Sequence, residues 1–286
     1  MEISGHTQLY AVLGHPVSHT LSPAMHNAAF AALGLDAVYV ALDVTPERLP
    51  SALAVLTDLG FGGLNITVPL KEVACRALPR LDESARLMGA VNTVQFAPEG
   101  ATGHNTDGAG FLRAIEEAFG APVAGLSLFI LGCGGAGRAV ALASAGAGVT
   151  KFALADLDGA RVRKLAMELE TQFLVSEALV VETPAEVIEA ARAADLVVQA
   201  TPAGLKPGDG SPLGAASFRA GQWAFDLVYG SPETSFLRAA RLGGARAANG
   251  LGMLLHQGAK AFEIWTGRAA PVDVMRRALE QKVFGA

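Results

Sequence analysis

The stretch LSLFIL-GCGGAG-RAVALA, residues 126–143, decides the fold of this chain. Its first six residues are mostly apolar and predict a strand, and the residues after position 137 favour a helix. Between them lies a G-x-G-x-x-G pattern, whose glycines suit a tight turn, a close approach of backbone to a pyrophosphate, and close packing of helix on strand. The helix N-terminus would face the phosphates. We therefore predict a dinucleotide site formed by Gly132, Cys133, Gly134, Gly135, Ala136 and Gly137. A plain glycine-rich turn is the alternative.

An acidic residue, Asp156, follows the glycines at about the spacing of 20 residues at which dinucleotide-binding folds carry an acid for the ribose hydroxyls. A carboxylate there would also repel a 2′-phosphate, and the nearest arginine is Arg161. The sequence therefore predicts NAD as the preferred cofactor, with NADP possible. The alternative is that Asp156 caps the helix that begins near residue 159.

The remaining sequence alternates between strand-like and helical segments. In the first half, strands are predicted at 8–13, 37–44 and 63–68, and helices at 22–33, 46–59 and from position 71. In the second half, strands are predicted at 126–131, 151–155, 178–182, 196–200 and 223–228. A connection is predicted at 119–125, and the chain after position 250 is helical. The fold class is α/β, with two domains: an N-terminal α/β domain with a mainly parallel sheet, and a Rossmann domain.

Composition excludes several classes of protein. Of the 286 residues, 51% are hydrophobic and 17% charged, so the chain is not disordered. The formal net charge of −5 argues against a nucleic-acid partner. The two cysteines, Cys75 and Cys133, favour a reducing cytoplasm over a secreted disulfide scaffold. We expect no signal peptide, no membrane partner and no metal, because neither a long apolar run nor a metal-ligand spacing such as HExxH occurs.

Polar residues of the first half gather in four short segments, SHTLSP, LNITVPLK, GAVNTV and GHNTDG. Taken singly, Ser22 is a helix cap, Asn92 an ordinary turn residue, and Lys71 a solvated lysine. Together, hydroxyl and amide groups suit a polyhydroxylated acid. Lys71 and Asp107 add a proton donor and a partner that orients it. Hydrolysis through a serine nucleophile is not indicated, since G-x-S-x-G is absent.

Six segments, GHPVSHTLSPAMHN, GLNITVPLKE, GAVNTV, GHNTDGAGF, GCGGAGRA and NGLGMLLHQGAKAF, resemble the shikimate dehydrogenase family, in this order and across almost the whole chain. The resemblance implies a substrate domain at 1–106 and 250–286 and a Rossmann domain at 107–249. It also implies reversible NAD(P)-dependent reduction of 3-dehydroshikimate to shikimate.

Carried over by motif, the resemblance implies that Lys71 and Asp107 are the catalytic pair. The hydroxyls of Thr20 and Ser22 would bind the substrate carboxylate, and further substrate contacts would come from Asn65, Thr67, Asn92, Tyr229 and Gln257. Gln257 could instead be a helix-surface amide. Further contacts to the cofactor would come from Thr201, Leu227 and Gly250.

Two departures from the family pattern bear on specificity. The first loop carries Thr20-Leu21-Ser22 where S-x-S is common, so an added methyl reshapes the carboxylate site. The second Rossmann strand is followed by Asp156-Leu157-Asp158 where NADP-type members carry Asn-Arg-Thr, which resembles NAD-preferring quinate/shikimate dehydrogenases. The alternatives are therefore a quinate/shikimate dehydrogenase of quinate catabolism, another alicyclic polyol dehydrogenase such as an aminoshikimate enzyme, and a non-catalytic regulator. A homodimer is possible, but the sequence does not fix the oligomeric state.

Overall fold

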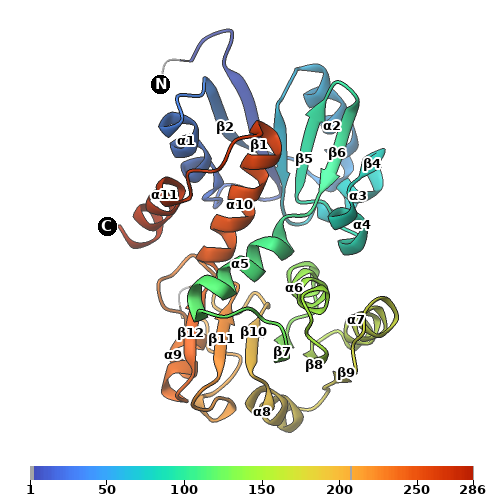
Figure 1. The fold of residues 1–286 in the computed structure, drawn as a ribbon, viewed down its shortest axis with the longest axis vertical. Helices are drawn as coiled ribbons and strands as arrows, with labels where there is room; N and C mark the ends of the chain where they lie inside the picture. Colours follow the sequence, from blue (N-terminus) through green and yellow to red (C-terminus); the bar gives the residue numbers. More distant parts are fainter. Residues whose placement is uncertain (1–2, 207, 286) are drawn as a thin grey trace. The chain divides into compact units, whose positions relative to one another are not determined.

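The computed structural model of the chain describes residues 3–206 and 208–285 and divides into two compact units (Figure 1). The first comprises Met1–Asp107 with Leu255–Ala286, and the second Gly108–Leu254. Each unit has its own sheet, so the predicted two-domain α/β class is confirmed. The contacts that define the two units do not identify the ligand of either unit. The division into a substrate domain at 1–106 and 250–286 and a cofactor domain at 107–249 therefore stays a prediction.

The first unit contains a six-stranded sheet in the order β2-β1-β3-β5-β6-β4. Its strands are β1 (Gln8–Gly14), β2 (Ala37–Asp43), β3 (Gly63–Ile66), β4 (Arg80–Leu81), β5 (Thr93–Ala97) and β6 (Gly100–His104). Strand β1 pairs in parallel with β2 and β3, and β4 with β6. Strand β5 is antiparallel to β3 and β6. The sheet is mainly parallel, as predicted, but the β5–β6 hairpin was not predicted.

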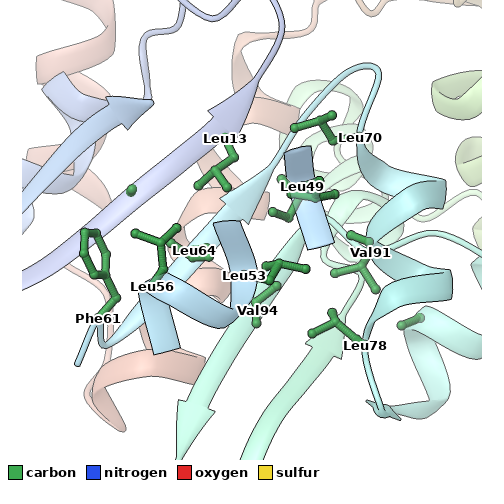
Figure 2. Packing of buried hydrophobic residues seen from close by; sticks show 14 residues of the cluster. Leu13, Leu49, Leu53, Leu56, Phe61, Leu64, Leu70, Leu78, Val91 and Val94 are labelled. Atoms are coloured by element: carbon green, nitrogen blue, oxygen red, sulfur yellow. The ribbon is translucent and has the colours of Figure 1, made fainter. Parts of the chain in front are cut away.

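One face of this sheet is covered by α2 (Leu49–Asp58), α3 (Lys71–Ala77) and α4 (Glu83–Met88). Leucines recur on α2 at helical spacing, and this stripe packs on the sheet residues Leu64 and Val94 (Figure 2). Because α3 and α4 pack in the same cluster, the position of Lys71 at the start of α3 is fixed by the core of the unit.

Aromatic side chains pack on the opposite face, between the sheet and the helices α1 (Ser22–Ala32) and α10 (Leu251–Thr266), and α11 (Val272–Phe284) packs on α1. The Trp265 indole of α10 packs against the Tyr10 ring of β1, and its Nε1 donates to the Val94 carbonyl of β5 at 3.0 Å. The C-terminal segment is therefore an integral layer of the first unit.

The second unit contains a six-stranded sheet in the order β12-β11-β10-β7-β8-β9, with every pairing parallel. The chain reaches it through α5 (Asp107–Phe119). The strands are β7 (Ser127–Leu131), β8 (Lys151–Ala155), β9 (Glu177–Val180), β10 (Leu196–Gln199), β11 (Trp223–Asp226) and β12 (Arg246–Asn249). They are joined through α6 (Gly135–Gly146), α7 (Gly159–Gln172), α8 (Pro184–Ala193), the short helix Ala215–Ser217 and α9 (Ser235–Leu242).

The strand order reverses between β7 and β10. In open parallel sheets, ligands bind outside the carboxyl ends of the strands at such a switch point. The loop after β7 begins at Gly132, and the loop after β10 begins at Ala200. The glycine pattern thus lies where a doubly wound sheet places a dinucleotide.

Candidate active site

The central pair of the first unit is Lys71 and Asp107, whose Nζ and Oδ2 atoms lie 2.6 Å apart. Lys71 is the first residue of α3 and Asp107 the first residue of α5. Their side chains are only 22% and 9% exposed, so Lys71 is not the solvated lysine of the alternative interpretation. The ammonium has three hydrogens, and the bond to Asp107 takes one. The other two can reach a ligand.

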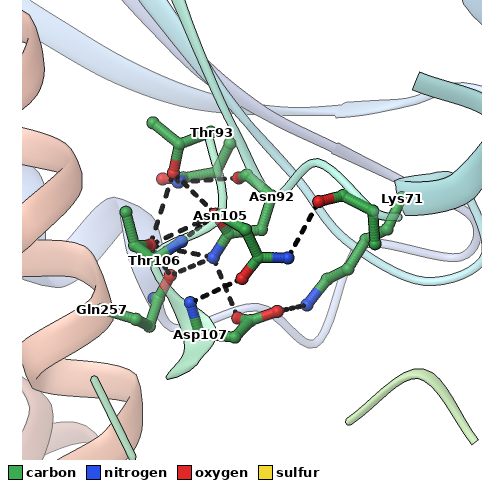
Figure 3. Close-up of polar contacts among 9 residues, drawn as sticks. Lys71, Asn92, Thr93, Asn105, Thr106, Asp107 and Gln257 are labelled. Carbon is green, nitrogen blue, oxygen red and sulfur yellow. Dashed lines mark hydrogen bonds and ion pairs between the residues drawn. The ribbon is translucent and has the colours of Figure 1, made fainter. Parts of the chain in front are cut away.

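The β5–β6 hairpin brings the polar segments around Asn92 and Asp107 together. Asn92 precedes β5, and Thr106 and Asp107 follow β6, with Thr93 in register with His104. The Asn92 amide nitrogen lies 2.9 Å from both Asp107 Oδ1 and Thr106 Oγ1, and its oxygen accepts from the Thr106 backbone N–H at 2.8 Å (Figure 3). Asn92 is therefore a buried link that holds the Asp107 carboxylate, rather than an ordinary turn residue.

Three residues that sequence reasoning did not assign to the site complete this network. Asn105 accepts the Asp107 backbone N–H on its side-chain oxygen at 3.0 Å and donates to the Ala90 carbonyl at 2.9 Å. Thr93 and Thr106 both donate to Asn92 Oδ1, at 3.0 and 3.2 Å. These three residues occur in the segments GAVNTV and GHNTDG, but Asn and Thr next to Gly are also typical of exposed turns.

Gln257 of α10 joins the same network. Its Oε1 atom lies 3.3 Å from Asn92 Nδ2 and 3.5 Å from Thr106 Oγ1 (Figure 3). The alternative of a helix-surface amide does not describe this position, because Gln257 faces buried polar side chains.

The other predicted substrate residues of the first unit lie near the carboxyl ends of β1 and β3. Asn65 of β3 is buried and donates to the Asn92 carbonyl and to Thr93 Oγ1, both at 3.1 Å. Thr20 and Ser22 share a hydroxyl–hydroxyl bond of 3.3 Å. Ser22 is the first residue of α1 and the N-cap is Leu21, so the helix-cap alternative for Ser22 does not apply. Thr67 is half-buried directly after β3, in contact with Gly14.

In the second unit, the three glycines of the pattern have different surroundings. Gly132 has a φ of +99°, and an added Cβ would lie 2.8 Å from the Ala200 carbonyl group. At Gly137 a Cβ would overlap the Gly132 carbonyl oxygen, whereas at Gly134 no atom lies within 4 Å. Gly135 and Ala136 form the exposed first turn of α6, whose N–H groups lack partners within the helix. This loop fits the approach of a phosphate to backbone N–H groups.

Asp156 forms hydrogen bonds that hold the glycine loop after β7. Its Oδ2 accepts the backbone N–H of Cys133 at 2.7 Å, and its Oδ1 accepts the N–H of Asp158 at 2.9 Å. The N-cap of α7 is Asp158, which accepts from Ala160 and Arg161, so the helix-cap alternative for Asp156 is also wrong. The Cys133 N–H therefore already donates to Asp156. Burial is the main cause that raises the pKa of the Cys133 thiol to about 12, and the negative charge of Asp156 is the smaller one. The thiol is therefore protonated at neutral pH.

The remaining predicted cofactor residues cluster around a buried carboxylate, Asp226. It accepts from the Val228 N–H at 3.0 Å and from the Thr234 hydroxyl, and burial raises its pKa. The neighbouring Gln199 accepts from the Thr201 N–H and donates to the Ala203 carbonyl. These bonds shape the loops that carry Thr201, Leu227 and Tyr229. Gly250 lies against the Leu227 carbonyl, where a Cβ would not fit.

Two further properties concern metals and membranes. Within residues 3–206 and 208–285, no group of three His, Cys, Asp or Glu side chains is placed to hold a metal ion. In the same part of the chain, the helices are too short or too polar to cross a membrane.

The chain matches two family models, the shikimate dehydrogenase substrate binding domain at residues 12–94 and the shikimate 5′-dehydrogenase C-terminal domain at residues 250–280. It is 48% identical to the shikimate dehydrogenase (NADP(+)) of Moorella thermoacetica, over 98% of this chain and 95% of that protein. Identity to the protein of the same name from Methanopyrus kandleri is 44%, over 98% and 97%. A solved shikimate dehydrogenase in complex with NADP+ superposes with a TM-score of 0.90 at 36% identity, covering 99% and 98% of the two chains.

The prediction that NAD is the preferred cofactor is wrong, because the relatives are NADP(+) enzymes by name. The prediction failed because it treated the Asp156 carboxylate as a free charge. Both of its carboxylate oxygens bind backbone N–H groups of the protein, which compensates part of the charge that was expected to exclude a 2′-phosphate. Spacing along the sequence located this carboxylate but not its hydrogen bonds. Identity and coverage over nearly the whole chain show that this protein belongs to the shikimate dehydrogenase family.

Proposed function

We propose that this protein is an NADP-dependent shikimate dehydrogenase that reversibly reduces 3-dehydroshikimate to shikimate. The observation that carries the proposal is the part-buried Lys71–Asp107 pair, set in a network of amides and hydroxyls. Family membership supports the same reaction, and the relatives are named for shikimate rather than quinate. A regulator without activity would have no chemical reason to keep an ammonium ion at such a site.

The glycine loop supports the choice of a dinucleotide. Gly134 leaves open space next to the first turn of α6, and Gly132 lies against the loop after β10. The exposed Arg161 lies in the first turn of α7, five residues after Asp156, and its guanidinium group pairs with the Asp158 carboxylate at 3.1 Å. Bound NADPH would supply the hydride for the reduction.

Lys71 handles the proton in this mechanism. In the reduction, its Nζ donates a proton to the substrate oxygen on which negative charge develops, and in the oxidation it accepts the hydroxyl proton. Asp107 holds the ammonium group in place, and Asn92 fixes the second carboxylate oxygen of Asp107. The geometry of Lys71 and Asp107 is therefore fixed before the substrate binds.

The remaining residues would bind and orient the substrate. We assign the carboxylate to the hydroxyls of Thr20 and Ser22, and the ring hydroxyls to Asn65, Thr67, Asn92 and Gln257. Tyr229 belongs to the second unit, where burial raises the pKa of its phenol. Its contact with the substrate stays a prediction. A homodimer and a cytoplasmic location stay predictions.

A steady-state assay tests the proposed function. The four combinations of shikimate or quinate with NADP or NAD are compared through kcat/KM. We expect shikimate with NADP to give the highest value. No turnover with any of the four would contradict the enzyme assignment, and a higher value for quinate would contradict the substrate assignment.

Removing the hydroxyls of Thr20 and Ser22 tests the carboxylate site. In the double variant Thr20→Ala/Ser22→Ala, we expect the KM for shikimate to rise by roughly tenfold or more, since a hydrogen bond to a charged group contributes about 1.5–3 kcal/mol. The KM for NADP should stay the same, because both residues lie in the first unit and the glycine loop in the second. An unchanged KM for shikimate in the folded variant would show that these hydroxyls do not bind the substrate.

A further inference from the structure

Tyr39 lies behind the proposed substrate site and is not among its predicted residues. It is part of β2, its side chain is 1% exposed, and its hydroxyl lies 2.6 Å from Asn65 Oδ1. The Asn27 side chain of α1 holds the Tyr39 backbone from both sides, accepting its N–H at 2.8 Å and donating to its carbonyl at 2.9 Å. Main chain and hydroxyl of this tyrosine are therefore both fixed.

The Tyr39 ring is held as firmly as its hydroxyl. The His26 imidazole stacks on it with ring centroids 4.4 Å apart and an angle of 16° between the planes. His26 is fully buried, and burial lowers its pKa to about 3, an effect that the nearby Asn65 side chain opposes in part. The neutral His26 imidazole therefore packs flat against the Tyr39 ring and restricts its orientation.

The contacts of Asn65 fix the direction of the bond from Tyr39. The Asn92 carbonyl can only accept, so Asn65 must point its NH₂ group at it, and the second amide hydrogen goes to Thr93 Oγ1. Asn65 Oδ1 therefore faces Tyr39, whose hydroxyl donates to it. Both amide hydrogens of Asn65 are used within the protein. Only the second lone pair of Oδ1 remains, so Asn65 can accept a hydrogen bond from a substrate hydroxyl but cannot donate one.

We propose that Tyr39 is a positioning residue, which fixes the Asn65 amide so that its oxygen recognises a hydroxyl group of the substrate. This inference rests on the proposed function. The Ser22 hydroxyl lies close enough to Tyr39 to oppose the rise in the phenol pKa that burial causes. The phenol therefore interacts with Asn65 and is also affected by a proposed carboxylate-binding residue. Losing the Tyr39 hydroxyl should weaken substrate binding without affecting proton transfer at Lys71.

The substitution Tyr39→Phe tests this, with Tyr10→Phe as the matched control. Tyr10 is the neighbour of Tyr39 in the register of β1 and β2 and packs in the same aromatic cluster, against Phe30 and Trp265. For Tyr39→Phe we expect the KM for shikimate to rise by about tenfold, the scale of one lost hydrogen bond, with kcat and the KM for NADP nearly unchanged. Tyr10→Phe should leave all three values as in the unmodified protein.

A double-mutant cycle with Asn65→Ala separates positioning from general packing. If Tyr39 acts through Asn65, then Tyr39→Phe/Asn65→Ala should have the same KM for shikimate as Asn65→Ala alone. This comparison also serves if Tyr39→Phe alone does not fold, because the double variant also removes Asn65 Oδ1, the buried oxygen that Tyr39→Phe leaves without its donor. A further rise in KM in the double variant, or equal effects of Tyr39→Phe and Tyr10→Phe, would overturn the proposal. Absence of turnover by the unmodified protein would instead overturn the proposed function.

Discussion

Replacing Lys71 with alanine is expected to lower kcat for shikimate oxidation by roughly a hundredfold or more, the scale of a lost general acid–base group. The KM values should change little, because the amides and hydroxyls around the site remain. The measurement is steady-state kinetics in both directions with NADP or NADPH. A variant that raises only KM would show that Lys71 binds the substrate and does not transfer the proton.

Two controls make this result interpretable. Lys260→Ala removes a lysine from the exposed face of α10 and should leave kcat unchanged. The second control addresses Asp107, which would lose its cation in Lys71→Ala and remain as a part-buried charge. The double variant Lys71→Met/Asp107→Asn removes both charges. It should recover thermal stability relative to Lys71→Ala but not activity.

The second unit was largely predictable from sequence, and the first was predictable in part. The strands of the second unit are short apolar runs between helical segments, which is typical of strands buried on both faces of a parallel sheet. Asn92, directly before the β5–β6 hairpin, and Thr93, the first residue of β5, are buried. Buried polar residues and exposed turn residues look alike in a sequence, so the hairpin was not predicted although the segments GAVNTV and GHNTDG at its two ends were singled out.

The site shows the same limit. The motifs identified Lys71 and Asp107, but nothing in their spacing showed that Asn92 would bond to the carboxylate, because that contact depends on the hairpin. Tyr39 occurs in an apolar strand pattern, where an aromatic residue is expected to be core, and its partner Asn65 is distant in the sequence. For Asp156 the inference from spacing to NAD preference was wrong, and its hydrogen bonds to backbone groups cannot be read from spacing.

Substitutions in the glycine loop should separate the fold from cofactor binding. Gly137 is buried, and a Cβ there would overlap the Gly132 carbonyl oxygen, a backbone atom that cannot move aside without distorting the turn. Overpacking of a core typically costs about 1–3 kcal/mol, and this clash is expected at the upper end or above. In a unit of this size, about 3 kcal/mol corresponds to a decrease in Tm of roughly 6–12 °C. Gly137→Ala should therefore unfold earlier whether or not NADP is added.

Gly134→Ala should behave differently. The backbone of Gly134 has a φ of −69°, which alanine adopts readily, and no atom lies within 4 Å of the added Cβ. Gly134 is the N-cap of α6, where alanine is less favourable, so a small loss of about 1 kcal/mol is expected. The methyl group would occupy the space that we assign to the pyrophosphate, and the affinity for NADP should fall by about tenfold or more.

Gly146→Ala, at the far end of the same helix, is the matched control. Its Cβ would make an ordinary contact of 3.6 Å with Phe173, so both Tm and NADP affinity should stay close to those of the unmodified protein. Calorimetry of unfolding and titration with NADP give the two quantities for all three variants. If Gly134→Ala binds NADP as well as Gly146→Ala does, the pyrophosphate does not approach this turn. If Gly137→Ala is as stable as the control, close packing does not explain the third glycine. Loss of stability in one variant and of affinity in the other is the outcome that assigns each glycine its physical role.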